Sequence, residues 1–200
     1  MPMDPADLDA DPLRQFEAWL TEAEATGQPL ANAFALATAS ADGVPSVRMV
    51  LLRGFDADGL GFYTNRRSRK GQDLAGNPRA AAAFHWAAMG RQVRVAGSVS
   101  AMDEADSAAY WATRPRASRI SAWASNQGDE TPSRDRLEAR VAELDVEYPG
   151  DAIPLPPFWG GYRLRPEVFE FWENRDDRLH DRVEYLPIPE GGWRRRRLQP

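Results

Sequence analysis

The spacing of apolar residues predicts one helix followed by a series of short strands. Within residues 11–26, Leu13, Phe16 and Trp19 recur at helical spacing, and Asp11 followed by Pro12 is typical of a helix start. Short apolar segments then alternate with turn sequences rich in Gly, Asp, Asn and Pro, which predicts strands at residues 34–38, 47–53, 60–64, 80–86 and 91–100. Such close spacing favours antiparallel pairing or a barrel over repeated βαβ units.

The second half of the chain returns to helical spacing and ends in strands. Helices are predicted at residues 68–75, 103–113 and 131–148, the last with Thr131 as its cap, and strands at 161–172, 182–186 and 193–198. The Pro-rich residues 149–157 are interpreted as a rigid turn inside one domain. The expected organisation is a mobile or disordered arm at 1–10 and one α+β domain with a barrel-like sheet at 11–200.

Composition narrows the function classes. The 200 residues include no Cys and two His, which argues against disulfides, thiolate nucleophiles and multi-histidine metal sites, so no metal is expected. A net charge of −5 argues against a general nucleic-acid surface. No apolar run approaches the roughly 20 residues of a membrane helix, and the acidic start does not resemble a secretory signal. We expect a cytoplasmic enzyme or binding protein.

Three cationic clusters stand out in this acidic chain. The first comprises Arg66, Arg67, Arg69 and Lys70 at the start of a predicted short helix, where free N–H groups favour a phosphate. A solvated basic turn is the alternative interpretation. The sequence contains no Gly-rich phosphate loop, which favours a mononucleotide held by side chains over a dinucleotide on a Rossmann fold.

The second cluster lies within residues 110–118. Tyr110 and Arg114 are four residues apart, hence neighbours on a helix, and Arg116 and Ser118 follow. An arginine offers a planar fork that suits phosphate oxygens, and the serine adds a hydroxyl donor. Alternatively, Arg114 and Arg116 flank a proline that simply ends the helix.

The third cluster is Arg178, His180 and Arg182, which would face one way if the backbone were extended. Asp181 between them could merely neutralise its neighbours. The run at residues 194–197 is interpreted as a solvated terminal strand. Nucleophile and metal motifs are absent, so an enzyme of this sequence would need an organic cofactor. The residues alone indicate a barrel protein for one or two anionic ligands.

At its C-terminal end the chain resembles a known family. Phe169-Glu170-Phe171-Trp172, five residues, and then Arg178-Leu179-His180-Asp181-Arg182 resemble the signature of the pyridoxine/pyridoxamine 5′-phosphate oxidases. The resemblance extends over residues 11–200 through the stretches 48–53, 62–65, 68–70, 91–93, 110–118, 122–127 and 157–163.

This resemblance implies a fold, a cofactor and site residues. The fold would be an antiparallel, Greek-key split β-barrel with flanking helices, binding FMN at a homodimer interface. The residues implied in FMN binding are Arg48, Met49, Val50, Leu51, Leu52, Arg53, Tyr63, Thr64, Arg69, Lys70, Gln92, Gln127, Gly128, Trp172 and Arg182, with Arg69 and Lys70 at its phosphate. Those implied in substrate binding are Arg53, Tyr110, Arg114, Ser118, Arg178, Leu179 and His180.

The implied reaction belongs to vitamin B6 metabolism. Arg178 and His180 would be the catalytic residues, lying over the substrate's pyridine ring opposite the flavin. Hydride would pass from the substrate's C4′ to flavin N5, and dioxygen would reoxidise the flavin. The products would be pyridoxal 5′-phosphate, hydrogen peroxide and, from the amine substrate, ammonia.

Several positions depart from the family pattern. Arg53 stands where Lys is usual, Gly128 replaces a Ser, and Glu173 replaces Gln, His or Gly, which would place a negative charge beside the flavin. The N-terminal arm also lacks a basic, Tyr-containing segment. Two alternatives therefore stay open: a related FMN-dependent oxidase of another substrate, such as a phenazine-pathway intermediate, and a non-catalytic protein that binds a flavin or pyridoxal phosphate.

Overall fold

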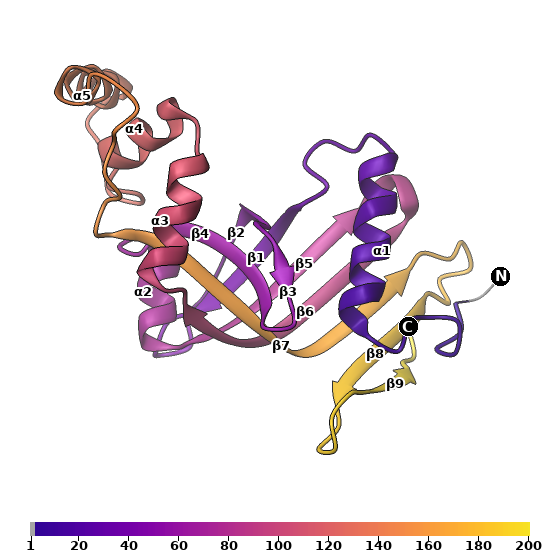
Figure 1. Cartoon of the computed structure of the whole chain (residues 1–200). Helices are drawn as coiled ribbons and strands as arrows, with labels where there is room; N and C mark the ends of the chain where they lie inside the picture. Colours follow the sequence, from indigo (N-terminus) through magenta and orange to yellow (C-terminus); the bar gives the residue numbers. More distant parts are fainter. Residues whose placement is uncertain (1–2) are drawn as a thin grey trace.

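The structure, a computed structural model, describes residues 3–200 and is built on one antiparallel sheet flanked by helices (Figure 1). The helices are α1 (Pro12–Ala25), α2 (Arg69–Gly76), the 3-10 turn η1 (Ala87–Met89), α3 (Glu104–Thr113), α4 (Arg116–Ala124) and α5 (Arg134–Glu147). The strands are β1 (Ala33–Ala39), β2 (Pro45–Leu51), β3 (Phe55–Asp56), β4 (Gly59–Asn65), β5 (Arg79–Trp86), β6 (Arg91–Ala101), β7 (Trp159–Glu173), β8 (Asp181–Pro187) and β9 (Trp193–Arg197).

The strand order is β2-β1-β5-β6-β7-β4-β3, with β8 added to β7 and β9 added to β8. The long strand β7 pairs with β4 along its first part, with β8 along its last part, and with β6 along most of its length. A register shift at Ala96/Gly97 bends this central pair. The sheet and its helices confirm the predicted α+β split-barrel class.

The main core lies between α1 and the sheet. The Asp11 carboxylate accepts the Leu13 N–H and caps the helix as predicted. Phe16 packs edge-on against Phe84 of β5, and Trp19 does the same against Phe171 of β7. The large aromatic residues of the sequence therefore lie mainly in this core.

A second apolar cluster lies among α3, α4, α5 and the start of β7. It is built on Trp111, Ile120, Leu144, Ile153 and Trp159, and the Trp111 indole donates to the Ile153 carbonyl. This cluster fixes α3 and α4 beside the first residues of β7. Figure 1 places α2 to α5 at one side of the molecule and α1, β8 and β9 at the other.

The structure differs from the sequence expectations at three places. α4 was not among the predicted helices: α3 does end with its C-cap at Arg114, but Pro115 is also the N-cap of a new helix. α5 is capped by Ser133, whose hydroxyl accepts the Arg136 N–H, rather than by Thr131. The extended backbone that would turn Arg178, His180 and Arg182 the same way is not present, because residues 178–180 lie in a bend before β8 and Arg178 has a φ of +66°.

The N-terminal residues lie against the last two strands. Met3 and Leu8 are buried, the Tyr185 hydroxyl donates to the Asp9 carbonyl, and Arg195 donates to the Leu8 carbonyl. Mobility of residues 1–10 stays a prediction, and residues 1 and 2 lie outside the described part. In residues 3–200, no helix combines the length and apolar character needed to cross a membrane.

Candidate functional site

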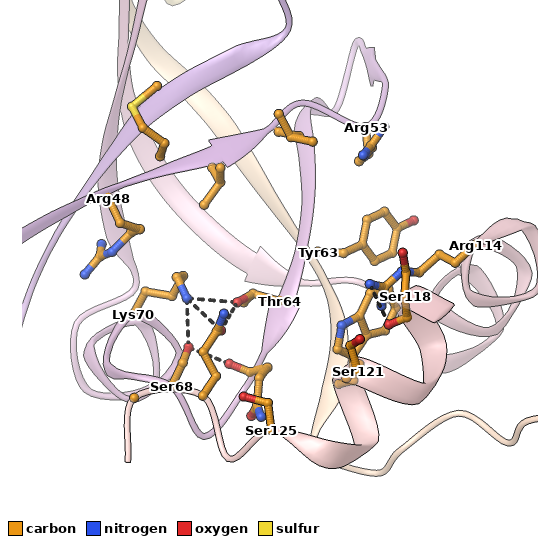
Figure 2. Close-up of a pocket in the computed structure, with 18 of the residues that line it drawn as sticks. Arg48, Arg53, Tyr63, Thr64, Ser68, Lys70, Arg114, Ser118, Ser121 and Ser125 are labelled. Carbon is orange, nitrogen blue, oxygen red and sulfur yellow. Dashed lines mark hydrogen bonds between the residues drawn. The ribbon is translucent and has the colours of Figure 1, made fainter. Parts of the chain in front are cut away.

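A cavity of about 1300 Å³ lies between the sheet and the helical side of the molecule (Figure 2). Strands β2 and β4, the start of α2, the α3–α4 corner and the segment after α4 line it. Its lining includes the predicted site residues Arg48, Met49, Val50, Leu51, Arg53, Tyr63, Thr64, Arg69, Lys70, Tyr110, Arg114, Ser118, Gln127 and Gly128. Leu52 is not among them, since it is buried in the core.

Lys70 forms one cationic end of the cavity. Its ammonium donates to Thr64 Oγ1 at 3.1 Å, Ser68 Oγ at 3.1 Å and Gln127 Oε1 at 3.0 Å, so all three hydrogen-bond partners are neutral. Burial, with a smaller contribution from nearby Arg48, lowers the pKa of Lys70 to about 8. A buried ammonium surrounded by neutral oxygens is stabilised by any anion that enters the cavity.

Asp73, which the sequence analysis did not single out, organises the other two cations at this end. Its buried carboxylate accepts the Thr38 hydroxyl at 2.7 Å and the Arg69 Nε–H at 3.1 Å, and it lies 3.9 Å from Arg48 Nη2. Arg48 also donates to the Leu36 carbonyl and to the Thr38 and Ser46 hydroxyls. The i,i+4 spacing to Arg69 is visible in the sequence, but the contacts of Asp73 with Thr38 of β1 and Arg48 of β2 are not.

Arg114 forms the other cationic end. Its Nη2 donates to the Ser118 carbonyl at 3.2 Å, while its Nη1 is buried with no hydrogen-bond partner among the described residues. The guanidinium lies 4.7 Å from the centre of the Trp159 ring and 5.2 Å from that of Trp111. An unpaired buried donor is costly, and because Arg114 lines the cavity, its guanidinium fork is suited to an anion that binds there.

Ser118 and Ser121 lie beside Arg114, whereas Thr64 and Ser68 lie beside Lys70 (Figure 2). The two cationic ends are therefore separate, and each has hydroxyl donors next to it. Arg116, which the sequence placed in the same cluster as Arg114, instead reaches Asp145 and the Tyr148 carbonyl and has no part in the cavity. Arg67 lies over the Phe158 ring.

Aromatic rings form the wall near the Arg114 end. The rings of Tyr63 and Tyr110 stack with their centroids 4.0 Å apart, and Tyr63 also stacks on Trp159 at 5.3 Å. Arg53 lies 5.8 Å from the centre of the Tyr110 ring. Burial, and to a smaller extent Asp106 and Tyr110, raise the pKa of Tyr63, which keeps its phenol protonated. This wall suits the edge of a planar, aromatic ligand.

The remaining predicted residues form a separate group on and beside β8. Gln92 of β6, Trp172 of β7 and Arg182 of β8 are directly opposite one another across three strands, and residues so paired share one face of the sheet. The Trp172 and His180 ring centroids are 4.7 Å apart. Arg178 and Leu179 lie in the exposed bend before β8, where the Leu179 side chain is 67% exposed. We call Gln92, Trp172, Arg178, Leu179, His180 and Arg182 the hairpin group.

The hairpin group does not line the cavity of its own chain. Trp159, which does line it, begins β7, whereas Trp172 lies near the end of that strand. Thirteen residues of strand span up to about 43 Å at ~3.3 Å per residue, although curvature shortens the direct distance. The cavity and the hairpin group therefore lie on different parts of the protomer.

Known proteins resemble this chain along nearly its whole length. A family model described as pyridoxamine 5′-phosphate oxidase matches residues 20–147, and one described as the pyridoxine 5′-phosphate oxidase C-terminal dimerisation region matches residues 159–200. The pyridoxine/pyridoxamine 5′-phosphate oxidase of Rubrobacter xylanophilus is 53% identical over 193 residues, covering 96% of this chain and 88% of that protein. That of Cupriavidus metallidurans is 51% identical, covering 97% and 91%.

Solved structures agree with these sequence relatives. PhzG from Burkholderia lata, crystallised with tetrahydrophenazine-1-carboxylic acid, has a TM-score of 0.91 and 33% identity, covering 98% of this chain and 96% of its own. A pyridoxamine 5′-phosphate oxidase-related, FMN-binding protein from Nostoc punctiforme shares the fold, with a TM-score of 0.76 at 22% identity, covering 94% and 98%. The sequence matches establish that this chain belongs to the pyridoxamine 5′-phosphate oxidase family.

Proposed function

We propose that this protein is an FMN-dependent oxidase that converts pyridoxine 5′-phosphate and pyridoxamine 5′-phosphate to pyridoxal 5′-phosphate. The observation that carries the proposal is a cavity with two separate cationic ends, each able to accept a phosphate. Among residues 3–200, Lys70 has only neutral hydrogen-bond partners, and Arg114 Nη1 is buried without a hydrogen-bond partner. Relatives about half identical to this chain carry the name of this oxidase.

The two ends suggest separate duties. Lys70 and Arg69, with Arg48, Thr64 and Gln127 nearby, would hold the FMN phosphate, because α2 begins there and its free N–H groups add to the positive field. Arg114, with Ser118, Tyr110 and Arg53, would hold the substrate phosphate. When bound, FMN supplies the acceptor for a hydride from the substrate's C4′ and passes the electrons to dioxygen, which yields peroxide.

We propose that a second protomer completes each site. The matched C-terminal dimerisation region, residues 159–200, contains all of β7, β8 and the bend between them, and therefore most of the hairpin group. A homodimer in which this group meets the partner's cavity would unite the two half-sites. Trp172 and Arg182 would then contact FMN, and Arg178 and His180 would lie against the substrate's ring.

The tautomer of His180 defines what it can offer there. Its Nδ1 accepts the Arg175 backbone N–H at 3.1 Å. A neutral imidazole with Nδ1 as acceptor carries its proton on Nε2. His180 would therefore present an Nε2–H donor to the substrate's hydroxyl or amine side, while Arg178 adds a positive charge nearby.

A related oxidase of a phenazine-pathway intermediate is the second candidate function. PhzG from Burkholderia lata has nearly the same backbone, with a TM-score of 0.91. Its 33% identity is lower than the 53% to the Rubrobacter oxidase. The unpaired Arg114 donor also favours a phosphorylated substrate, since a ligand without that group would leave the donor unsatisfied.

A single series of measurements tests the proposal. The purified protein is expected to release FMN, rather than FAD or riboflavin, on denaturation. With either phosphorylated substrate and dioxygen it should form pyridoxal 5′-phosphate and peroxide in equal amounts. A protein that gains no thermal stability from FMN would contradict the proposal, because a ligand that binds only the native state must stabilise it. Turnover of tetrahydrophenazine-1-carboxylic acid, the ligand of the PhzG structure, without turnover of the pyridine phosphates would support the second candidate.

A further inference from the structure

Two carboxylates face each other where the β7–β8 hairpin opens. Glu173 ends β7, Asp181 begins β8, and the two are a registered cross-strand pair. Their side chains are only 20% and 6% exposed. Like charges directly opposite each other destabilise an antiparallel pair. The loop 174–180, which carries Arg178 and His180, joins these two residues. A cation between their carboxylates is therefore needed to offset the repulsion at the base of the loop.

Arg175 supplies that cation. Its Nη2 lies 3.1 Å from Glu173 Oε1 and 2.5 Å from Asp181 Oδ2, and its Nε donates to the same Asp181 oxygen at 2.6 Å. Arg91 neutralises the other Glu173 oxygen at 2.8 Å, and Arg197 that of Asp181 at 2.6 Å. Glu173 is thus held in ion pairs at the hairpin and does not place an unpaired negative charge beside a flavin.

The backbone of the same residue contacts both residues proposed to lie over the substrate. The Arg175 N–H donates to His180 Nδ1 at 3.1 Å, and the Arg175 carbonyl accepts the Arg178 N–H at 3.2 Å. Arg178 has a φ of +66°, a conformation that is unfavourable for a non-glycine residue and persists only where surrounding contacts impose it. The side chain of Arg175 therefore fixes the base of the loop, and its backbone fixes the two functional side chains.

We infer that Arg175 is a positioning residue of the oxidase reaction, which holds His180 in its Nε2–H tautomer and Arg178 in its left-handed conformation by bridging Glu173 and Asp181. This inference rests on the proposed function for its catalytic consequence only. The effect on the His180 imidazole does not depend on what the protein oxidises. Glu173 and Asp181 act through Arg175, and none of the three needs to touch substrate.

The test compares Arg175→Ala and Arg175→Lys with the wild-type holoenzyme. The first readout is the ¹⁵N NMR spectrum of the imidazole rings, in which a protonated and a bare nitrogen differ strongly. The chain has two histidines, and the exposed His85 serves as the internal reference. The second readout is the separate measurement of kcat, KM and FMN affinity. Arg79→Ala, which removes an exposed ion pair with Glu167 elsewhere on β7, is the matched control.

In Arg175→Ala, the His180 Nδ1 signal should shift toward a mixture of tautomers while His85 is unchanged. kcat should fall roughly tenfold or more, as expected for loss of a charge-assisted contact, with FMN affinity within about threefold. Arg175→Lys should recover part of kcat, because lysine keeps the positive charge but lacks the planar guanidinium that contacts both carboxylates. If Arg175→Ala does not fold, Arg175→Lys alone tests the inference, and its His180 Nδ1 signal and its kcat should change in the same direction by a smaller amount.

An unchanged His180 spectrum, or a kcat within twofold of the wild type in the folded variants, would overturn the inference. So would a loss confined to FMN affinity, which would make Arg175 a residue of the cofactor site. A shifted His180 spectrum in a protein without oxidase activity would leave the positioning role standing and would count against the proposed function instead.

Discussion

Lys70 and Arg114 are the two residues whose surroundings most clearly demand a ligand. Each is at least partly withdrawn from water, and within the part of the chain that the structure describes neither positive charge pairs with a carboxylate. Burial lowers the pKa of both groups, which is the sign of a cation held at a cost. By contrast, Arg116, two residues after Arg114, pairs with Asp145. Of these three residues, only Lys70 and Arg114 are expected to contribute to ligand binding.

Replacing the two cations should have different consequences. Lys70→Ala should weaken FMN binding by about one to two powers of ten, since a charge-assisted hydrogen bond contributes roughly 1.5–3 kcal/mol, and excess FMN should restore activity. Arg114→Ala should keep its flavin but lower kcat/KM by a similar factor, chiefly through KM. Flavin content and steady-state kinetics measure both effects, with Arg116→Ala as control. The reverse pattern would exchange the two roles.

The titration of Lys70 predicts how FMN affinity depends on pH. The ammonium is the form that attracts phosphate, and in the free protein its pKa is lowered to about 8. Affinity should therefore fall as the pH rises above about 8, by up to about tenfold per pH unit. Fluorescence titration of FMN between pH 6.5 and 10 measures this. Lys70→Arg, which does not titrate in this range, should show a nearly flat profile; an equally steep one would assign the pH dependence to another group.

The same pKa makes a prediction about the protein without flavin. The folded-state pKa of Lys70 lies below the ordinary value of 10.5. Between these values the unfolded chain binds more protons than the folded one, so the contribution of Lys70 to the free energy of unfolding grows as the pH rises from about 8 to 10.5. Lys70→Met should remove this pH-dependent contribution. Urea unfolding of the wild type and of Lys70→Met between about pH 8 and 10.5 measures the difference.

At the scale of elements, the bend in the β6–β7 pair depends on one glycine. A Cβ on Gly97 would lie 1.9 Å from the Arg165 carbonyl oxygen, and the register of the pair shifts at this point. Gly97→Ala must displace backbone, so it should lower the free energy of unfolding by about 1–3 kcal/mol. Gly150→Ala, where nothing lies within 4 Å, is the matched control. Equal stability of the two variants in urea would contradict this account of the bend.

The hydrophobic pattern of the sequence correctly predicts the helices and strands that bury one regular face. β1 alternates between buried and half-buried side chains, and α1 buries Phe16, Trp19 and Leu20 on one side, so their bounds agree to within about two residues. The pattern missed α4, a short helix of which only Arg119 and Ile120 are buried. Nor does it describe residues 178–180, because their conformation depends on the contacts of Arg175 rather than on any periodicity.

The candidate site was predictable only as a set of residues. Sequence resemblance selected Lys70, Arg114 and Trp172, but it could not show that the first two line one cavity while the third lies outside it, opposite Arg182 on the sheet. Nor could it identify Asp73, which joins Arg48, Arg69 and Thr38 across three elements. Such groupings arise from tertiary packing, which local patterns do not encode.

At the scale of the whole molecule, positive charge is concentrated in the cavity although the net charge of the chain is negative. The chain carries a net charge of −5, yet the cavity gathers Arg48, Arg53, Arg69, Lys70 and Arg114. A cavity lined by one sign of charge attracts anionic ligands whatever the total charge of the protein. Both proposed ligands carry a phosphate, so this local field should favour their entry.

The division into two half-sites leads to a test on mixed dimers. If each complete site combines the cavity of one protomer with the hairpin group of the other, Arg114→Ala and Arg178→Ala impair different halves. A heterodimer with one variant in each protomer then contains one site with neither change and one site with both. Differently tagged chains, co-expressed and purified through both tags, would yield this heterodimer.

Its turnover should be about half that of the wild-type dimer, with the wild-type KM, because one of two equivalent sites is intact in a two-fold symmetric assembly. Each variant homodimer should stay impaired. The matched control is the heterodimer of Arg114→Ala with Lys70→Ala, assayed without added FMN: both residues line the same cavity, so every site carries one change and no recovery is expected. Were the first heterodimer as impaired as its parents, the complete site would have to lie within one protomer, and the 174–180 loop would have to move a long way to reach its own cavity.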